Sequence, residues 1–329
     1  MKMKSFFLQS ILVLTAAFTL NNGAAAADDD GGYAGAFLRM GLGAEAMAMG
    51  GAYTAIPAGA YALYYNPAGL PLMSHREVRL SYDFLSLDRR FSFIGYAQAL
   101  HPKVSDEEKG KLDGGFALGW INAGVDNIDG RDLDGKSIGT LSNSENAFYF
   151  AFALRPHRIV SLGLSAKVLY NRIPGVTSEN GAISATGFGL DFGVMISPFP
   201  QLNAAVVLKD LKSKYTWNTE KLWERATTTV DRFPQVVRGG LAYRLPMEWL
   251  TVSADLETSD KQDPRYHVGI EALKNGRVAG RLGLDNGEPT FGIGFTLGIW
   301  GKTTSIDYAY VSESDGPRAD HVFSWTFHF

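Results

Sequence analysis

The chain has 329 residues with 31 basic and 34 acidic side chains, so its formal net charge is −3, and it contains no basic block. This balance excludes nucleic acid as a partner, because binding to a phosphate backbone needs concentrated positive charge. The absence of cysteine excludes a disulfide scaffold and any thiol chemistry. A hydrophobic content of 46% fits a soluble protein or a membrane barrel, because a barrel hides its apolar side chains at every second strand position.

The first 27 residues predict a cleaved signal peptide. Lys2 and Lys4 form a positive start, an apolar stretch runs from residue 6 to residue 20, and small residues precede Asp28. The alternative is a transmembrane anchor, but about 15 apolar residues fall short of the roughly 20 that span a bilayer as a helix. We therefore expect cleavage just before Asp28 and export to the outer membrane.

Residues 28–76 and residues 77–329 differ in pattern. The first region is rich in Ala, Gly and Met and shows no alternation of apolar and polar positions. The second is a succession of alternating segments separated by turn residues, which is typical of half-buried strands. The predicted strands are 77–87, 91–100, 115–123, 147–154, 161–170, 185–196, 202–209, 235–243, 250–256, 266–272, 278–284, 290–299, 305–310 and 322–329.

These segments predict an all-β fold, an antiparallel transmembrane barrel of about fourteen strands with the N-terminal segment as a plug in its lumen. The connections alternate between short turns and long polar stretches, and the long ones are expected as outer loops at 124–146, 171–184 and 212–234. Short periplasmic turns and long outer loops are typical of an outer-membrane barrel. A soluble β-sandwich would show the same strand alternation but gives no reason for alternating loop lengths.

Charges in the middle of the predicted strands all fall on the phase opposite the apolar residues. On the lipid face such a charge would cost about 2–4 kcal/mol at the midplane, so these side chains are predicted to point into the lumen. They are Lys167, Asp191, Asp255, Glu271, Arg281 and Asp307.

The C-terminal segment alternates aromatic residues and ends on one. Phe323, Trp325, Phe327 and Phe329 occupy every second position. A last strand of this kind resembles the signal that the barrel-assembly machinery reads on its substrates. We therefore expect these four residues to direct assembly.

No arrangement of residues predicts an enzyme, a cofactor or a metal site. The six His residues lack metal-ligand spacing, and no nucleophile elbow occurs. Asp126, Asp129, Asp132 and Asp134 cluster in one predicted outer loop, which is read as a solvated polar loop; weak divalent-ion binding near lipopolysaccharide is the alternative.

Two short motifs in the N-terminal segment resemble the signature of the PorV/PorQ family. They are the run Met-Gly50-Gly51-Ala and the run Asn66-Pro67-Ala68-Gly69-Leu. This family is similar to the FadL-type transporters of hydrophobic compounds. The resemblance implies a fourteen-stranded barrel with the N-terminal segment as a hatch in the lumen.

One stretch departs from the family pattern, because relatives often carry an acidic pair between the two motifs and this chain has Pro57-Ala58-Gly59. Any role tied to those acids is in doubt here. In the hatch, Arg39 and Glu45 are expected to pair with wall charges, for which Asp191, Asp255, Glu271, Lys167 and Arg281 are candidates.

Three functions remain open at this point. The barrel either moves hydrophobic small molecules past the hatch, with exit sideways through the wall, or acts like PorV as a component of a type IX-like secretion system that binds cargo or partner proteins. A structural barrel is the third. The expected partners are outer-membrane lipid and lipopolysaccharide, the barrel-assembly machinery, and a hydrophobic ligand or secretion-system proteins.

Overall fold

The computed structural model describes residues 33–100, 113–132, 134–175, 181–218, 228–299, 301–312 and 319–329. Its fifteen strands form one antiparallel sheet, and fourteen of them close into a ring in which each strand pairs with two neighbours. The prediction of a fourteen-stranded all-β barrel is therefore confirmed. The predicted signal peptide lies outside the described residues.

The fourteen strands of the ring follow one another in chain order. They are β1 (Glu77–Phe84), β2 (Arg89–Leu100), β3 (Asp113–Arg131), β4 (Ser137–His157), β5 (Val160–Ile173), β6 (Ile183–Phe199), β7 (Leu202–Asn218), β9 (Val236–Arg244), β10 (Leu250–Ser259), β11 (Arg265–Lys274), β12 (Val278–Asp285), β13 (Glu288–Ile299), β14 (Lys302–Val311) and β15 (Asp320–His328). The additional strand β8 (Thr228–Arg232) extends the sheet only alongside the end of β7.

The last strand closes the barrel against the first. β15 pairs with all of β1, so that Leu80 lies opposite Trp325 and Glu77 lies opposite His328. Beyond the strand end, the backbone N–H of Phe329 donates to a carbonyl of the residue before β1 at 2.9 Å. Closure removes both sheet edges, so the wall pairs its own backbone groups as a bilayer requires.

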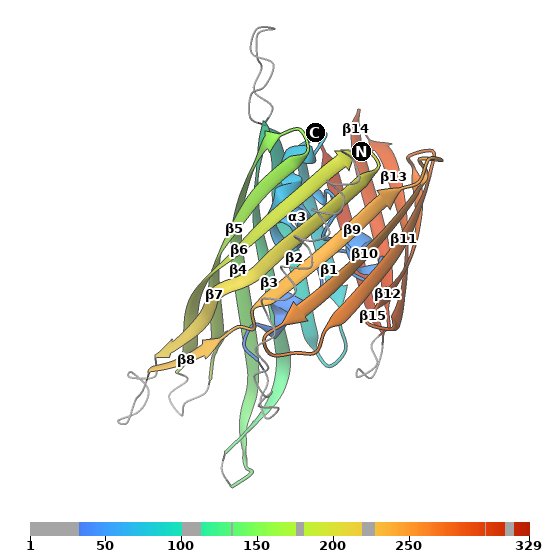
Figure 1. Cartoon of the computed structure of the whole chain (residues 1–329). Helices are drawn as coiled ribbons and strands as arrows, with labels where there is room; N and C mark the ends of the chain where they lie inside the picture. The colour runs from blue at the N-terminus through green and yellow to red at the C-terminus, as the bar shows by residue number, and fades with distance from the viewer. Residues whose placement is uncertain are drawn as a thin grey trace.

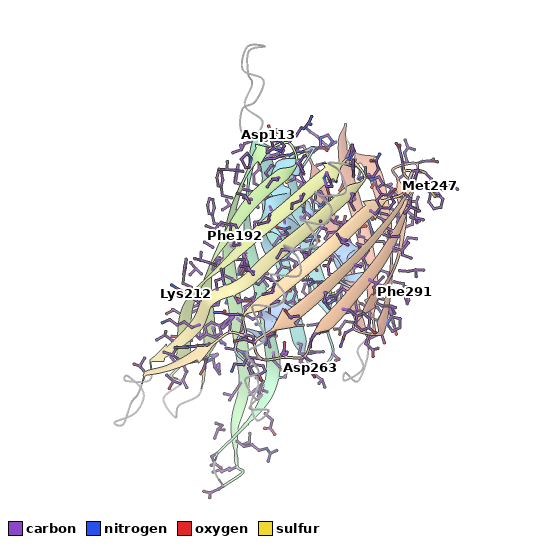
Figure 2. The ribbon with its side chains drawn as sticks, in the orientation of Figure 1. Asp113, Phe192, Lys212, Met247, Asp263 and Phe291 are labelled. Atoms are coloured by element: carbon purple, nitrogen blue, oxygen red, sulfur yellow. The ribbon has the colours of Figure 1, made fainter. Side chains whose placement is uncertain are left out.

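The alternation of side chains along each strand separates a lipid face from a lumen face. In β15, Phe323 and Trp325 are 46% and 42% exposed, whereas Ser324 between them is 3% exposed. Phe192 and Phe291 lie on the same outer face of the wall (Figure 2). An apolar outer surface of this extent needs a bilayer around it, so the chain is an outer-membrane barrel.

The predicted outer loops are partly wrong, because several strands continue past the membrane region. β3 and β4 are still paired where Ile128 lies opposite Leu141, within the stretch predicted as the loop 124–146. β7 likewise continues to Asn218 alongside β8. The β3–β4 hairpin projects from the end of the barrel opposite the C-terminus (Figure 1). Water surrounds this hairpin on both faces, so its residues need no alternation and the strand pattern is lost.

Residues 33–76, here called the hatch segment, lie inside the ring of strands (Figure 1). The hatch segment consists of short helical turns, η1 (Ala36–Arg39), α2 (Ala44–Met47), η2 (Gly59–Tyr61), α3 (Ala62–Tyr65) and η3 (Pro67–Leu72). α2 contacts β13, β14 and β15, whereas η3 contacts β2 to β6, so the segment reaches from one side of the wall to the other. Across the described ranges of the chain, no helix has the length and apolarity needed to cross a membrane.

Candidate functional site

A buried lysine on the lumen face pairs with two aspartates of neighbouring strands. Lys167 Nζ on β5 lies 2.8 Å from Asp191 Oδ1 on β6 and 2.7 Å from Asp210 Oδ1 on β7, and all three side chains are buried. Asp210 turns inward together with Lys209 because β7 bulges here, where its register against β6 shifts on both sides of Leu190. This charge cluster is built by the wall alone.

A second charge cluster lies on the lumen face of β11, β12 and β14. Arg281 Nε lies 2.7 Å from Glu271 Oε2, and Arg281 Nη1 lies 2.7 Å from Asp307 Oδ1. Arg281 and Asp307 are buried, and Glu271 is half-buried. A buried charge without a partner costs about 3–5 kcal/mol, so these mutual pairs explain how the wall holds charges inside the barrel.

The hatch segment contributes one carboxylate to the wall. Glu45 in α2 pairs with Arg79 of β1, which also pairs with Glu77 on the same strand. Burial disfavours the charged form of Glu45, but the guanidinium groups of Arg79 and Arg281 outweigh this effect and lower the pKa of its carboxyl group. The hatch therefore places a carboxyl group against the guanidinium of Arg79 on β1.

The direct ion pairs of the two hatch charges differ from the expected ones, although the candidate Arg281 is close enough for its charge to act on Glu45. Glu45 pairs with Arg79, which was not among the candidates. Among the described residues, Arg39 donates a hydrogen bond only to the backbone carbonyl of Ala34, at 3.2 Å. The candidate wall charges are already paired within the wall, because Lys167 and Arg281 each hold two carboxylates there.

The wall holds the hatch mainly through backbone groups. Asp255 Oδ2 on β10 accepts hydrogen bonds from the backbone N–H groups of Tyr53 and Thr54, both at 3.0 Å. The same oxygen lies 3.1 Å from Nε of Arg238 on β9, and another nitrogen of Arg238 donates to the carbonyl of Gly51. Asp255, one of the six predicted lumen charges, therefore anchors the hatch directly.

The first hatch motif forms a left-handed turn against β12 and β13. Gly50 and Gly51 have φ angles of 63° and 76°, which disfavour any residue with a side chain. A Cβ at Gly50 would lie 2.4 Å from the carbonyl oxygen of Leu284. Thr290 Oγ1 accepts from the N–H of Gly50 at 3.0 Å, and His267 Nδ1 lies 2.9 Å from its carbonyl oxygen. Only glycine fits this docked turn.

The second hatch motif starts η3 and links back to the first. Asn66 Oδ1 accepts from the N–H of Ala68 at 3.0 Å, and Pro67 occupies the first position of the helix, where no N–H is needed. Gly69 N–H donates to the carbonyl of Asn66 at 3.1 Å. The side-chain amide of Asn66 donates to the carbonyl of Thr54 at 2.9 Å, which ties the second motif to the residues that follow the first.

Glycines of the wall let the hatch backbone approach it directly. A Cβ at Gly163 on β5 would lie 2.4 Å from Ala68 N, and a Cβ at Gly193 on β6 would lie 2.1 Å from Asn66 Oδ1. On the other side of the lumen, a Cβ at Gly283 would lie 2.1 Å from Gly50 N. Both motifs therefore dock on glycine positions of the strands.

The stretch that departs from the family pattern meets an acid of the wall. Gly59 has a φ of 57°, and Glu77 lies so close that a Cβ at Gly59 would overlap its carboxylate. Glu77 Oε1 also accepts from the N–H of Ala60 at 2.8 Å. In this chain a wall carboxylate supplies negative charge next to the stretch 57–59.

Sequence reasoning missed several charges of the lumen. Arg79 and Arg238 occupy the same inward phase as the predicted charges, so the alternation rule applied to β1 and β9 would have found them. Lys209 and Asp210 are consecutive, so alternation places only one of them inside. A bulge turns both inward, and nothing in the pattern indicates it.

We expect Asp255→Ala to loosen the hatch. The substitution removes the acceptor of two hatch N–H groups and one partner of a buried guanidinium, which together destabilise the folded protein by about 3–5 kcal/mol. The temperature at which the gel mobility changes from that of the folded barrel to that of the unfolded chain should fall. A protease added to the folded barrel should cleave within residues 33–76.

The matched control is Asp191→Ala, because Asp191 is an equally buried aspartate whose partners, Lys167 and the backbone of Asp210, both belong to the wall. It should lower thermal stability while the hatch stays resistant to the protease. Equal cleavage in both variants would show that Asp255 has no special role in holding the hatch.

Within the described part of the chain, no three His, Cys, Asp or Glu residues are grouped so that they could hold a metal ion.

Comparisons with known proteins show the fold. No protein-family model and no curated protein matches the chain. Among solved structures it is similar to the CymD monoaromatic hydrocarbon channel, with 14% identity, a TM-score of 0.56, and coverage of 88% of this chain and 98% of CymD. A deletion mutant of the TodX monoaromatic hydrocarbon channel gives 12% identity, a TM-score of 0.59, and coverage of 88% and 99%.

A Pseudomonas aeruginosa FadL homologue gives 10% identity, a TM-score of 0.56, and coverage of 88% of this chain and 98% of that one. Sequence identities this low establish a shared architecture and nothing finer. The shared architecture is a closed β-barrel, and membership of the PorV/PorQ family stays a prediction.

Proposed function

We propose that the chain transports hydrophobic small molecules across the outer membrane, along an apolar seam between the hatch segment and one side of the wall. The seam is a single connected cluster of buried apolar side chains. The wall contributes Phe91, Phe93, Ala97, Ala117, Ile121, Ala123, Ala147, Tyr149, Ala151, Ala153, Leu169, Ala185, Tyr215 and Phe233. The hatch contributes Phe37, Leu38, Leu42, Ala46, Met49, Tyr53, Ala58, Ala60, Tyr61, Ala62, Leu63, Tyr64, Tyr65, Leu70 and Met73.

The length of this apolar seam is the observation that carries the proposal. Tyr215 and Phe233 lie toward the outer end of the barrel, next to β8, and their rings pack edge to face at 5.0 Å. At the inner end, Met73 precedes β1 and Ala153 lies near the turn after β4. An uncharged apolar molecule would therefore meet apolar side chains from one end of the lumen to the other.

The seam is filled by its own side chains, which separates this barrel from an open aqueous pore. Leu63, Tyr61 and Ile121 are completely buried, with no exposed surface. A polar solute thus finds no water-filled route along the seam, whereas an apolar molecule can replace one apolar contact with another as side chains shift. This selectivity by polarity is what the proposed transport requires.

The similar structures support a hydrophobic substrate class. TodX and CymD are described as monoaromatic hydrocarbon channels. The similarity covers 88% of this chain and nearly all of each channel. The structures named above are described as hydrocarbon channels and as a FadL homologue, and none of these descriptions supports a secretion role.

Overfilling the seam should reduce uptake of hydrophobic molecules. Ala117 is fully buried on the lumen face of β3, so Ala117→Phe adds a ring where no space exists. Uptake of radiolabelled toluene by cells with an intact lipopolysaccharide layer should fall at least about fivefold if the added ring blocks the seam. Heat-modifiable mobility verifies that the barrel has formed.

Leu118→Phe is the control, since Leu118 is the next residue of the same strand but is 49% exposed on the lipid face. It should leave toluene uptake unchanged. Transport through the seam would be excluded if the Ala117→Phe barrel took up toluene as fast as the unmodified barrel. It would also be excluded if the unmodified barrel took up glucose as fast as toluene.

A further inference from the structure

A hollow opens on the lipid-facing side of the wall, over strands β1 to β4. Its volume is about 430 Å³. Gly95 on β2 and Gly119 on β3 lie opposite each other, and their backbones form part of its floor. The side chains around the floor are apolar or aromatic, and they belong to Val78, Ile94, Tyr96, Leu118, Trp120 and Phe148. We call this space the wall hollow.

The wall hollow is open because two aromatic side chains at its ends are held apart. Trp120 Nε1 donates to Asn146 Oδ1 at 3.0 Å, on the side toward the β3–β4 hairpin. Tyr96 Oη donates to Gln98 Oε1 at 2.6 Å, on the side toward the periplasm. These hydrogen bonds draw both rings away from the space above the paired glycines.

A row of polar side chains borders the wall hollow on its outer side. Asn122 on β3 lies opposite Asn146 on β4, which lies opposite Tyr170 on β5. Asn146 Oδ1 accepts from Asn122 Nδ2 at 2.9 Å, in addition to the indole N–H of Trp120. Asn122 Oδ1 accepts no hydrogen bond from a residue that the structure describes. An amide facing hydrocarbon is costly, so this row belongs at the level of the polar lipid head groups.

A single positive charge lies beyond the polar row. Arg172 is two residues past Tyr170 on β5, so it points to the same outward side, and it is exposed. It forms no ion pair with any carboxylate in the described part of the chain. Arg172 is four residues along β5 from Val168, which lies opposite Phe148, and this separation is roughly 13 Å at the rise of a strand.

We propose that the wall hollow binds an acyl chain of a phosphorylated glycolipid of the outer leaflet, with the sugar of the lipid against the polar row and its phosphate against Arg172. The bilayer already covers this face of the wall, and its order from apolar through polar to cationic matches the order of acyl chain, sugar and phosphate. Small-molecule sites of this volume are mostly apolar, with a few polar groups that fix the orientation of the ligand.

The polar contacts suit such a head group. A sugar hydroxyl can donate to Asn122 Oδ1, which is free to accept. The guanidinium fork of Arg172 matches two oxygen atoms of a phosphate. The roughly 13 Å between Phe148 and Arg172 leaves room for a sugar between the acyl chain and the phosphate.

This site goes beyond the proposed function, because it lies on the lipid face and its occupancy is measured without transport. The probe is a bisphosphorylated, hexa-acylated lipid A, added to the full chain in non-ionic detergent. Native mass spectrometry counts the bound lipid molecules and gives the dissociation constant. We expect saturable binding of one lipid A per chain.

Filling the wall hollow should displace the lipid. Ile94→Trp places a larger side chain in the hollow and should weaken lipid A binding by at least about tenfold, because part of the acyl chain loses its contacts. Ile293→Trp on β13 is the matched control, since Ile94 and Ile293 are 45% and 43% exposed on the lipid face. It should bind lipid A like the unmodified chain. Heat-modifiable mobility verifies that both barrels have formed.

Removing the positive charge tests the phosphate contact separately. Arg172→Gln should weaken lipid A binding by at least about tenfold, as expected for the loss of a charge-assisted hydrogen bond. Arg244→Gln, which changes an exposed arginine at the inner end of β9, should have no effect. Lipid A without its phosphates should bind the unmodified chain at least as weakly as lipid A binds Arg172→Gln.

Lipid A binding that is unchanged in either Ile94→Trp or Arg172→Gln would overturn the proposal. Equally tight binding of phosphatidylglycerol, which carries a phosphate but no sugar, would also overturn it. If the full chain is a dimer that Ile94→Trp separates, a second copy of the chain occupies the wall hollow, and the proposal is likewise wrong.

Discussion

Deleting residues 31–74 should convert the barrel into an open pore, with single-channel conductance in planar bilayers at least about tenfold above that of the full chain. A lumen of about fourteen strands is wider than wall side chains alone can fill, so water enters once the segment is gone. In the structure the hatch segment supplies about half of the seam's buried side chains and reaches across the lumen. The conductance therefore measures whether this segment blocks the lumen.

The barrel should survive this deletion because most lumen charges are paired within the wall. Lys167 keeps both of its aspartates, and Arg281 keeps Glu271 and Asp307. Arg79 loses Glu45 but keeps Glu77. Water that fills the lumen also hydrates these groups, so the penalty for a buried charge no longer applies.

A deletion outside the lumen provides the comparison. Removing residues 127–140 shortens the projecting β3–β4 hairpin and leaves the hatch segment in place. Its conductance should match that of the full chain. If the hatch deletion conducts no better than this shortened barrel, the segment is not a plug, and Asn66 and Pro67 lose the role assigned to them.

The wall could be predicted from the sequence because a membrane barrel repeats one rule at every strand. Lipid on one side and a packed lumen on the other make each strand alternate, and a single charge such as Lys167 reveals the inward phase. The same rule explains the failures. The alternation of side chains stops in the β3–β4 hairpin because this hairpin leaves the membrane. In β7 the alternation changes phase because the strand bulges at Lys209.

The arrangement within the lumen could not be predicted, because it depends on contacts between residues far apart in the chain. Asp255 was predicted to face inward, but its partners are backbone N–H groups of Tyr53 and Thr54, which no side-chain pattern reveals. Gly163 and Gly193 look like ordinary small residues of a strand. Only the structure shows that the hatch backbone occupies the space a Cβ would need.

Changing Phe327 and Phe329 together to Ser should leave export intact and abolish insertion into the outer membrane, so that the chain is recovered in the periplasm or degraded. Phe327 lies in β15, the strand that closes the barrel, and Phe329, which follows directly after it, is 49% exposed. Neither is needed for closure itself, because the β1–β15 ladder is made of backbone groups. Fractionation and heat-modifiable mobility measure the outcome.

The loss of two apolar side chains from the lipid face is not by itself enough to explain such a block. Each Phe contributes about 1.5–3 kcal/mol of burial, and other outward rings contribute the same. Phe291→Ser with Phe295→Ser on β13 is therefore the matched variant, since these rings are 47% and 44% exposed and lie within the wall. We expect it to insert at reduced stability.

If both double variants insert equally well or fail equally, the position of the rings at the C-terminus has no role in assembly, and the terminal rings act only as lipid-facing surface. If only the terminal pair fails, the difference between two equal apolar losses must arise before the sheet closes, when the last strand is recognised.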